Sequence, residues 1–126
     1  MVSIDKEKFH IHLTDEGIMH YHIKACEEFT LEDMKLVLDC VKEIGEKPKY
    51  PNLITFDSYI TITSEAREFA ASEKSNIYTI CDAFVVKKTA LKLLGNFYLS
   101  MNKPAVPTKL FEDVESAKKW LITFLQ

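Results

Sequence analysis

The sequence has few of the residues that build the commonest phosphate and nucleic-acid sites. Arg67 is the one arginine among 16 lysine and arginine residues, so planar guanidinium groups that bind phosphate or carboxylate in pairs are scarce. Three glycines occur, Gly17, Gly45 and Gly95, and they are too dispersed for a glycine-rich phosphate loop. A net charge of −3 argues against a nucleic-acid partner, because neutralising phosphates needs clustered lysine and arginine residues.

Catalytic and secretory signals are also missing. The sequence contains no GxSxG or HExxH motif and no nucleophile, base and orienting residue at plausible spacing, so we expect no intrinsic catalysis and no cofactor. The three cysteines, Cys26, Cys40 and Cys81, are an odd number without a CxxC pair, which favours reduced thiols over disulfides. The N-terminus is charged and no apolar run approaches the roughly 18 residues of a membrane helix. We expect a cytoplasmic protein with no membrane span.

What is present is typical of one globular domain. The chain has 126 residues, of which 47% are hydrophobic and 28% charged, and it contains no repeat, low-complexity tract or long linker. We expect a single domain over residues 1–126.

Period-two alternation predicts a β-hairpin near the N-terminus. Apolar residues alternate with polar ones over 9–14 and again over 19–24, and the sequence Asp15-Glu16-Gly17 fits a three-residue loop. Thr14 should then pair with Ile18. This register places all four histidines of the chain on one face: His10, His12, His20 and His22.

Helices and strands alternate after the hairpin. Thr30 is a good N-cap for a helix, with Asp33 in the capping-box position, and Gly45 ends that helix. We predict strands over 52–59, 82–87 and 107–111. We predict further helices that begin at Ser64 and extend through 78, that run over 89–101, and that follow Asp113. The order ββαβαβαβα implies a mixed sheet of about five strands with four helices.

The C-terminal third resembles the SpoIIAA-like, STAS-type family of small bacterial proteins. The resemblance lies in Gly95-Asn96-Phe97, in Asn102-Lys103-Pro104, in Pro107-Thr108 with Phe111, and in Ala117 with Trp120-Leu121. The SEAREF stretch around Arg67 is also similar to the second helix of the family, and the order of elements agrees along the whole chain.

The resemblance implies a STAS-like fold and a regulatory, non-enzymatic role related to anti-sigma-factor antagonists. It also implies a relation to carriers of hydrophobic ligands of the CRAL-TRIO type. The chain departs from the antagonists at their phosphoacceptor, because ITSEARE stands where they have a D-S-x-G-like motif. Asp57-Ser58 lies several residues too early to replace it.

The histidine face has three interpretations. It is a solvated or dimer-facing polar surface, a metal site, or a pH sensor, because opposed residues of a hairpin place imidazoles about 5 Å apart at Cβ. No acidic residue alternates with the histidines to complete a metal site. A polar surface is the simplest of the three interpretations.

Thr63, Ser64, Arg67 and Asp57 are the candidate ligand- or phosphate-binding residues. Ser64 and Thr63 lie where the antagonists carry their phosphoacceptor, and either hydroxyl also serves as an N-cap. Arg67, one turn into the helix, should have a specific partner: Asp57, a phosphate on Ser64, or the anionic group of a ligand.

We therefore expect a non-enzymatic regulatory or binding domain that acts through a protein partner and forms homodimers. The alternatives are a carrier or sensor of a small hydrophobic or anionic ligand, and metal or pH sensing through the histidine-rich hairpin.

Overall fold

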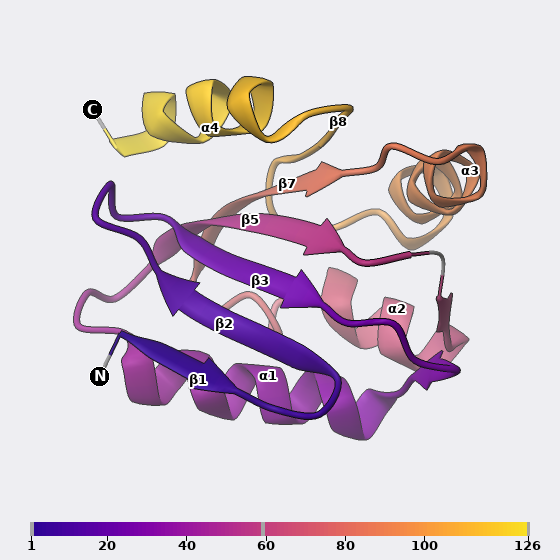
Figure 1. Ribbon diagram of the computed structural model, residues 1–126, viewed down its shortest axis with the longest axis horizontal. Helices are drawn as coiled ribbons and strands as arrows, with labels where there is room; N and C mark the ends of the chain where they lie inside the picture. Colours follow the sequence, from indigo (N-terminus) through magenta and orange to yellow (C-terminus); the bar gives the residue numbers. More distant parts are fainter. Residues whose placement is uncertain (1, 59, 126) are drawn as a thin grey trace.

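The computed structural model of the chain describes residues 2–58 and 60–125, and its centre is a six-stranded sheet (Figure 1). The strand order is β1-β2-β3-β5-β7-β8, antiparallel from β1 to β3 and parallel from β3 to β8. These strands are Ser3–Asp5, Phe9–Leu13, Met19–Ile23, Tyr50–Phe56, Thr79–Val85 and Thr108–Phe111. The predicted mixed sheet is confirmed, and β2, β3, β5, β7 and β8 are its five expected strands.

Three short strands raise the total above the expected five. β1 pairs with β2 at the edge of the sheet, and β4 (Glu28–Phe29) pairs in parallel with β6 (Thr61–Ile62) in a separate two-stranded sheet. Each of the three has only two or three residues. Such segments are too short to display the period of two, so their pairing becomes visible only in the tertiary structure.

The hairpin forms in the predicted register. The amide of Thr14 donates to the carbonyl of Ile18 at 2.9 Å, and Gly17 has a φ of 89°, the left-handed conformation that the loop requires. His10 lies opposite His22, and His12 lies opposite His20.

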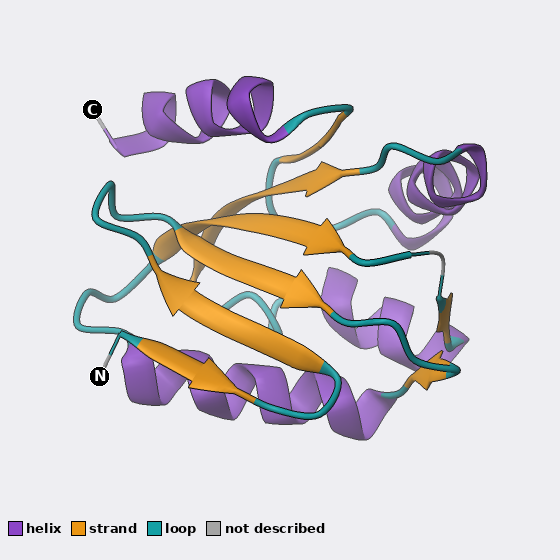
Figure 2. Cartoon of the chain, viewed as in Figure 1, coloured by secondary structure: helices purple, strands orange, loops and turns teal. Residues whose placement is uncertain are grey.

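Four α-helices surround the sheet, as predicted (Figure 2). They are α1 (Leu31–Ile44), α2 (Ser64–Ala71), α3 (Thr89–Phe97) and α4 (Val114–Ile122). A π-helical turn, Tyr98–Asn102, continues α3, and a 3₁₀ turn, Thr123–Leu125, follows α4. α1 and α2 lie on one side of the sheet, α4 lies on the other, and α3 lies beyond the ends of β5 and β7. Within the described ranges, no helix has the length and apolarity needed to cross a membrane.

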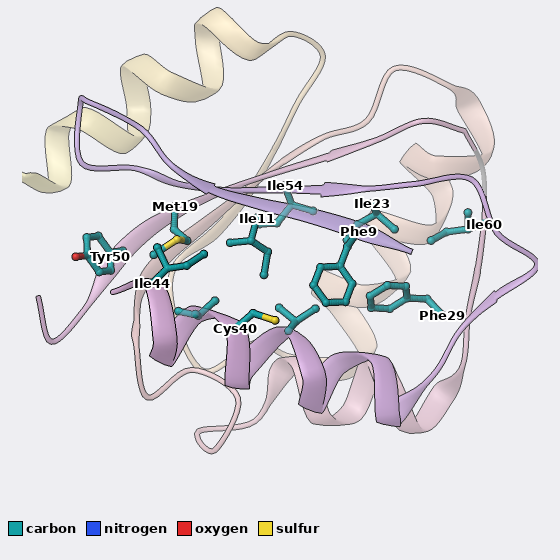
Figure 3. Packing of buried hydrophobic residues seen from close by; sticks show 12 residues of the cluster. Phe9, Ile11, Met19, Ile23, Phe29, Cys40, Ile44, Tyr50, Ile54 and Ile60 are labelled. Atoms are coloured by element: carbon teal, nitrogen blue, oxygen red, sulfur yellow. The ribbon is translucent and has the colours of Figure 1, made fainter. Parts of the chain in front are cut away.

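Two apolar clusters fill the space on either side of the sheet. One joins α1 to the hairpin and β5 (Figure 3), and the other joins α4 to β5 and β7. Because side chains alternate along a strand, Leu53 and Cys81 pack toward α4 while Ile54 and Phe84 pack toward α1. Asn52 and Asp82 therefore belong to the side of the sheet that carries α1.

Several predicted boundaries shift. β5 and β7 each begin and end two or three residues earlier than predicted, and Tyr59, the predicted end of the first of them, lies outside the described residues. α2 ends at Ala71 and not at 78, because the side-chain amide of Asn76 donates to the carbonyls of Ala70 and Ser72 at 2.9 and 2.7 Å. These bonds satisfy carbonyls that a longer helix would use.

Candidate functional site

A cavity of about 130 Å³ lies between the sheet and the helices α1, α2 and α3. Its walls are mainly aliphatic and aromatic, with Met34 and Val37 from α1, Leu91 and Leu94 from α3, and Ile54 from β5. The alternation of the strands produces this arrangement, since every second residue of β3, β5 and β7 faces the same side.

The polar groups of the cavity floor come from neighbouring parallel strands. Asn52 of β5 lies beside Asp82 of β7 in the strand register. The side-chain amide of Asn52 donates to Asp82 Oδ1 at 2.9 Å and to Thr79 Oγ1 at 3.0 Å. Asn52 is 1% exposed and Asp82 8% exposed, so the carboxyl group lies deep in the protein. Burial raises the pKa of Asp82 to about 6, and the hydrogen bond from Asn52 opposes the shift.

Aromatic side chains line the same cavity as this carboxyl group, Tyr21 and Tyr98 among them. Burial, and after it the charge of Asp82, raises the pKa values of the two phenols. The Phe84 ring packs edge-on against Tyr98, with centroids 5.8 Å apart, and stacks on Phe56 at 6.4 Å. All four rings line the cavity, so one ionisable carboxyl group lies among aromatic walls.

Arg67 reaches the same cavity from α2. Its guanidinium donates to the backbone carbonyl of Ile62 and lies over the Phe97 ring, 5.4 Å from the centroid. Its Nε is buried and has no partner among the described residues. The partners of Arg67 are thus a backbone carbonyl and an aromatic ring. No ion pair to Asp57, one of the three partners considered, occurs among the described residues.

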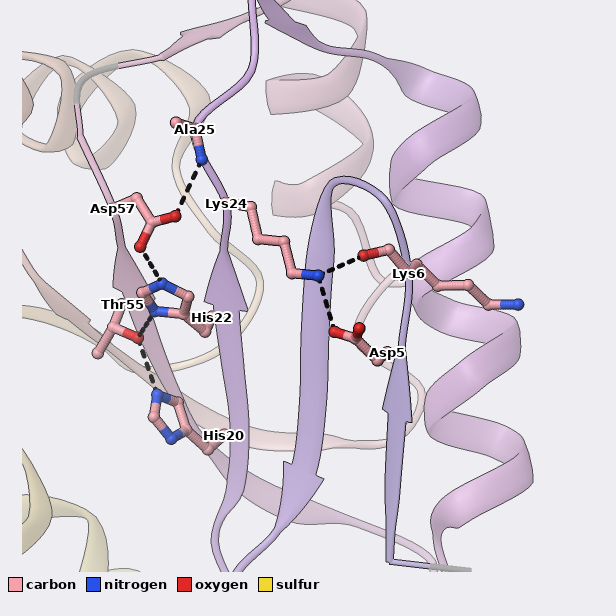
Figure 4. Close-up of polar contacts among 8 residues, drawn as sticks. All are labelled: Asp5, Lys6, His20, His22, Lys24, Ala25, Thr55 and Asp57. Carbon is pink, nitrogen blue, oxygen red and sulfur yellow. Dashed lines mark hydrogen bonds and ion pairs between the residues drawn. The ribbon is translucent and has the colours of Figure 1, made fainter.

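Asp57 is bound by the hairpin instead. At the end of β5 it accepts from His22 Nε2 at 2.6 Å and from the Ala25 amide at 3.2 Å (Figure 4). These bonds lower the pKa of the Asp57 carboxyl group, with His22 the main cause. Within the described ranges, the side chain of Asp57 makes its bonds to His22 and Ala25 and none to α2. A ligand-binding role of Asp57 stays a prediction.

Thr63, and not Ser64, is the N-cap of α2. Its hydroxyl accepts from the Ala66 amide at 3.2 Å, while Ser64 is the exposed first residue of the helix. Arg67 is accordingly the fourth helical residue. Binding of a phosphate or another anion at Thr63 and Ser64 stays a prediction.

The four histidines do not converge on a common point. Thr55 Oγ1 is bonded by His20 at 2.8 Å and by His22 at 2.7 Å (Figure 4), and His10 contacts Asp5 at 3.1 Å. Acidic residues do reach this face, from β1 and the end of β5, which the hairpin sequence alone did not reveal. In residues 2–58 and 60–125, no three His, Cys, Asp or Glu side chains are grouped so as to hold a metal ion. The geometry of the described residues gives no support to the metal hypothesis for His10, His12, His20 and His22.

The comparisons with known proteins agree with this architecture. Residues 11–125 match the family model described as Domain of unknown function (DUF7793). The chain belongs to this family. It is also similar to the crystal structure of an uncharacterized protein from the DUF3478 family, with a SpoIIAA-like fold, from Shewanella loihica PV-4. That similarity covers 90% of this chain and 91% of the other, at 18% identity and a TM-score of 0.56. No curated protein matches the chain.

The similar structure has the SpoIIAA-like fold, so the fold predicted from the C-terminal motifs is confirmed. At 18% identity the similarity shows the fold and nothing more. The cavity floor of this DUF7793 protein was missed. One signal was available: Asn52 and Asp82 are the first residues of two predicted strands whose next four residues are mostly apolar. A buried polar residue in a parallel strand needs a partner, and the neighbouring strand supplied it.

Proposed function

We propose that this DUF7793 protein binds a small, largely apolar molecule in the cavity between the sheet and α1, α2 and α3, without catalysing a reaction. The observation that carries the proposal is the cavity itself, about 130 Å³ with mainly apolar walls and a few polar groups on its floor. Ligand sites generally have this composition. Apolar cavities of about 150 Å³ are known to accept benzene, so the size suits a ligand with one ring or a short chain.

Packing energy supports binding of this kind. A ligand that fills the cavity makes dispersion contacts with wall atoms that otherwise have no packing partner. Removal of the ligand's own apolar surface from water also favours binding. The polar floor would then orient the ligand.

The test combines native mass spectrometry with a variant that fills the cavity. Protein purified without denaturation should carry a small bound molecule, and toluene should raise the melting temperature. Ala70 lines the cavity from α2, whereas Ala90 is exposed on α3. Ala70→Leu should lower occupancy and abolish the toluene effect, and the control Ala90→Leu should change neither.

The proposal fails if the protein carries no bound molecule and toluene has no effect. Turnover above background in a broad hydrolase and phosphatase screen would contradict the absence of catalysis. In that case the residues of the cavity floor would be the first to substitute.

A second candidate is regulation through a protein partner. The observation that favours it is an outward row on α3 and the π-helical turn, Leu93, Phe97 and Met101, which are 66, 47 and 65% exposed. Residues 87–103 also contain four lysines and no acidic residue. This surface suits a partner whose apolar contact area has an acidic rim.

A matched pair of variants tests this candidate. Met101→Glu should abolish capture of a partner, and Val2→Glu, at an equally exposed apolar residue 62% exposed, should leave it unchanged. Capture that both variants retain would count against the row as the docking surface.

A further inference from the structure

The charge and the walls of the cavity point to a ligand class, an inference that rests on the proposed function. We propose that the cavity selects a small organic cation, an apolar body with a protonated amine, and that the amine binds Asp82.

Asp82 has acceptor capacity that its surroundings do not use. Its recorded hydrogen bond is the one from Asn52 to Oδ1, and no ion pair to Asp82 occurs among the residues that the structure describes. Buried carboxylates are normally paired, because an isolated charge in the interior is expensive. An ammonium group in the cavity would supply the missing counter-charge.

The neighbouring amide adds a second acceptor. Both hydrogens of the Asn52 amide are donated, to Asp82 and Thr79, so its Oδ1 is the atom left over. That oxygen is buried and has no partner within the described ranges. The floor thus offers acceptors and needs donors, and an ammonium group carries donors only.

The aromatic walls favour the same ligand. Tyr21, Phe56, Phe84 and Tyr98 line the cavity, and the faces of aromatic rings attract cations. A carboxylate among ring faces holds an ammonium group by two effects that a neutral molecule of the same shape lacks. An anion, by contrast, would be repelled by the negative charge of Asp82.

Arg67 is the other charged group on the cavity wall, and Tyr21, Tyr78 and Tyr98 are the remaining titratable ones. The guanidinium already donates to Ile62 and lies over Phe97. No ion pair joins Arg67 to Asp82 among the residues that the structure describes.

The experiment compares three probes of nearly equal shape on the full chain: toluene, benzyl alcohol and benzylamine, the last protonated at pH 7.5. Calorimetric titration should give at least tenfold tighter binding of benzylamine than of the other two. Asp82→Asn should remove this preference and leave toluene affinity within twofold. The control Asp57→Asn, at an exposed carboxylate outside the cavity, should retain it.

A pH series on the unmodified chain gives an independent readout. Between pH 7.5 and pH 5 the affinity for benzylamine should fall severalfold as Asp82 takes up a proton, while toluene affinity should stay constant. Equal affinities for toluene and benzylamine would overturn the inference and leave the proposed function standing. Failure of all three probes to bind would contradict the proposed function itself.

Discussion

Asp82 carries a stability cost that a neutral side chain would remove. Burial raises its pKa from 3.8 to about 6, so between these values the folded protein keeps a proton that the unfolded chain has released. Stability therefore falls as the pH rises through this window, and the full penalty is present above it. A shift of this size corresponds to about 3 kcal/mol.

We expect Asp82→Asn to be more stable than the unmodified protein at pH 7, by up to about 3 kcal/mol, with little difference at pH 4. The new amide oxygen still accepts from Asn52. Urea denaturation at the two pH values measures the difference. A variant that is equally stable or less stable at pH 7 would show that Asp82 is already compensated in the folded protein.

His20 should produce the opposite pH dependence. Burial, followed by the neighbouring His22 and His12, lowers its pKa from 6.5 to about 4, so the folded protein holds it neutral. As the pH falls through this window the unfolded chain binds the proton first, and stability is lost.

Between pH 7 and pH 4.5, His20→Gln should lose less unfolding free energy than the unmodified protein, by on the order of 1–2 kcal/mol. Gln keeps a polar group near Thr55, the partner of His20. The matched control is His12→Gln, at an exposed position on the same face. The free energy of unfolding is measured by chemical denaturation at each pH. If it changed equally with pH in both variants, the role of His20 would be refuted.

At the scale of single elements, two adjacent hydroxyls at the start of α2 have different roles. Thr63 caps the helix and Ser64 does not. Thr63→Ala should cost about 1 kcal/mol of stability, whereas Ser64→Ala should change it by less than about 0.5 kcal/mol. Thermal or urea unfolding of the two variants decides the assignment, and a larger loss for Ser64→Ala would reverse it.

Arg67 connects α2 to α3. Because its planar group lies over Phe97 and donates to Ile62, Arg67→Lys should cost about 1 kcal/mol. A double-mutant cycle with Phe97→Leu isolates the contact between cation and ring. Additive effects of the two substitutions, or a Lys variant as stable as the unmodified chain, would mean that the contact contributes nothing in solution.

At the scale of the whole molecule, the homodimer stays a prediction. Light scattering at tens of micromolar should give twice the chain mass of 14.5 kDa. If the hairpin face forms the interface, as expected, His12→Glu should lower the measured mass and Met101→Glu should not. A single-chain mass for the unmodified protein would end the prediction.

The sequence by itself determined the hairpin, the capping of α1 and the SpoIIAA-like fold. Asp15-Glu16-Gly17 sets the register of β2 and β3, and Thr30 with Asp33 forms the predicted capping box. The hairpin and the cap depend on residues a few positions apart, so periodicity and local hydrogen bonding are enough to reveal them. The four helices follow for the same reason. The SpoIIAA-like fold was predicted from the resemblance of the C-terminal third to that family.

Only the tertiary structure decided the cavity and its chemistry. Asn52 and Asp82 are 30 residues apart, and they meet because β5 and β7 become neighbours in a parallel sheet. The partners of Arg67 and Asp57 depend in the same way on which elements pack together. Strand order and side-chain packing are properties of the whole chain, and no local pattern encodes which buried polar group will find which partner.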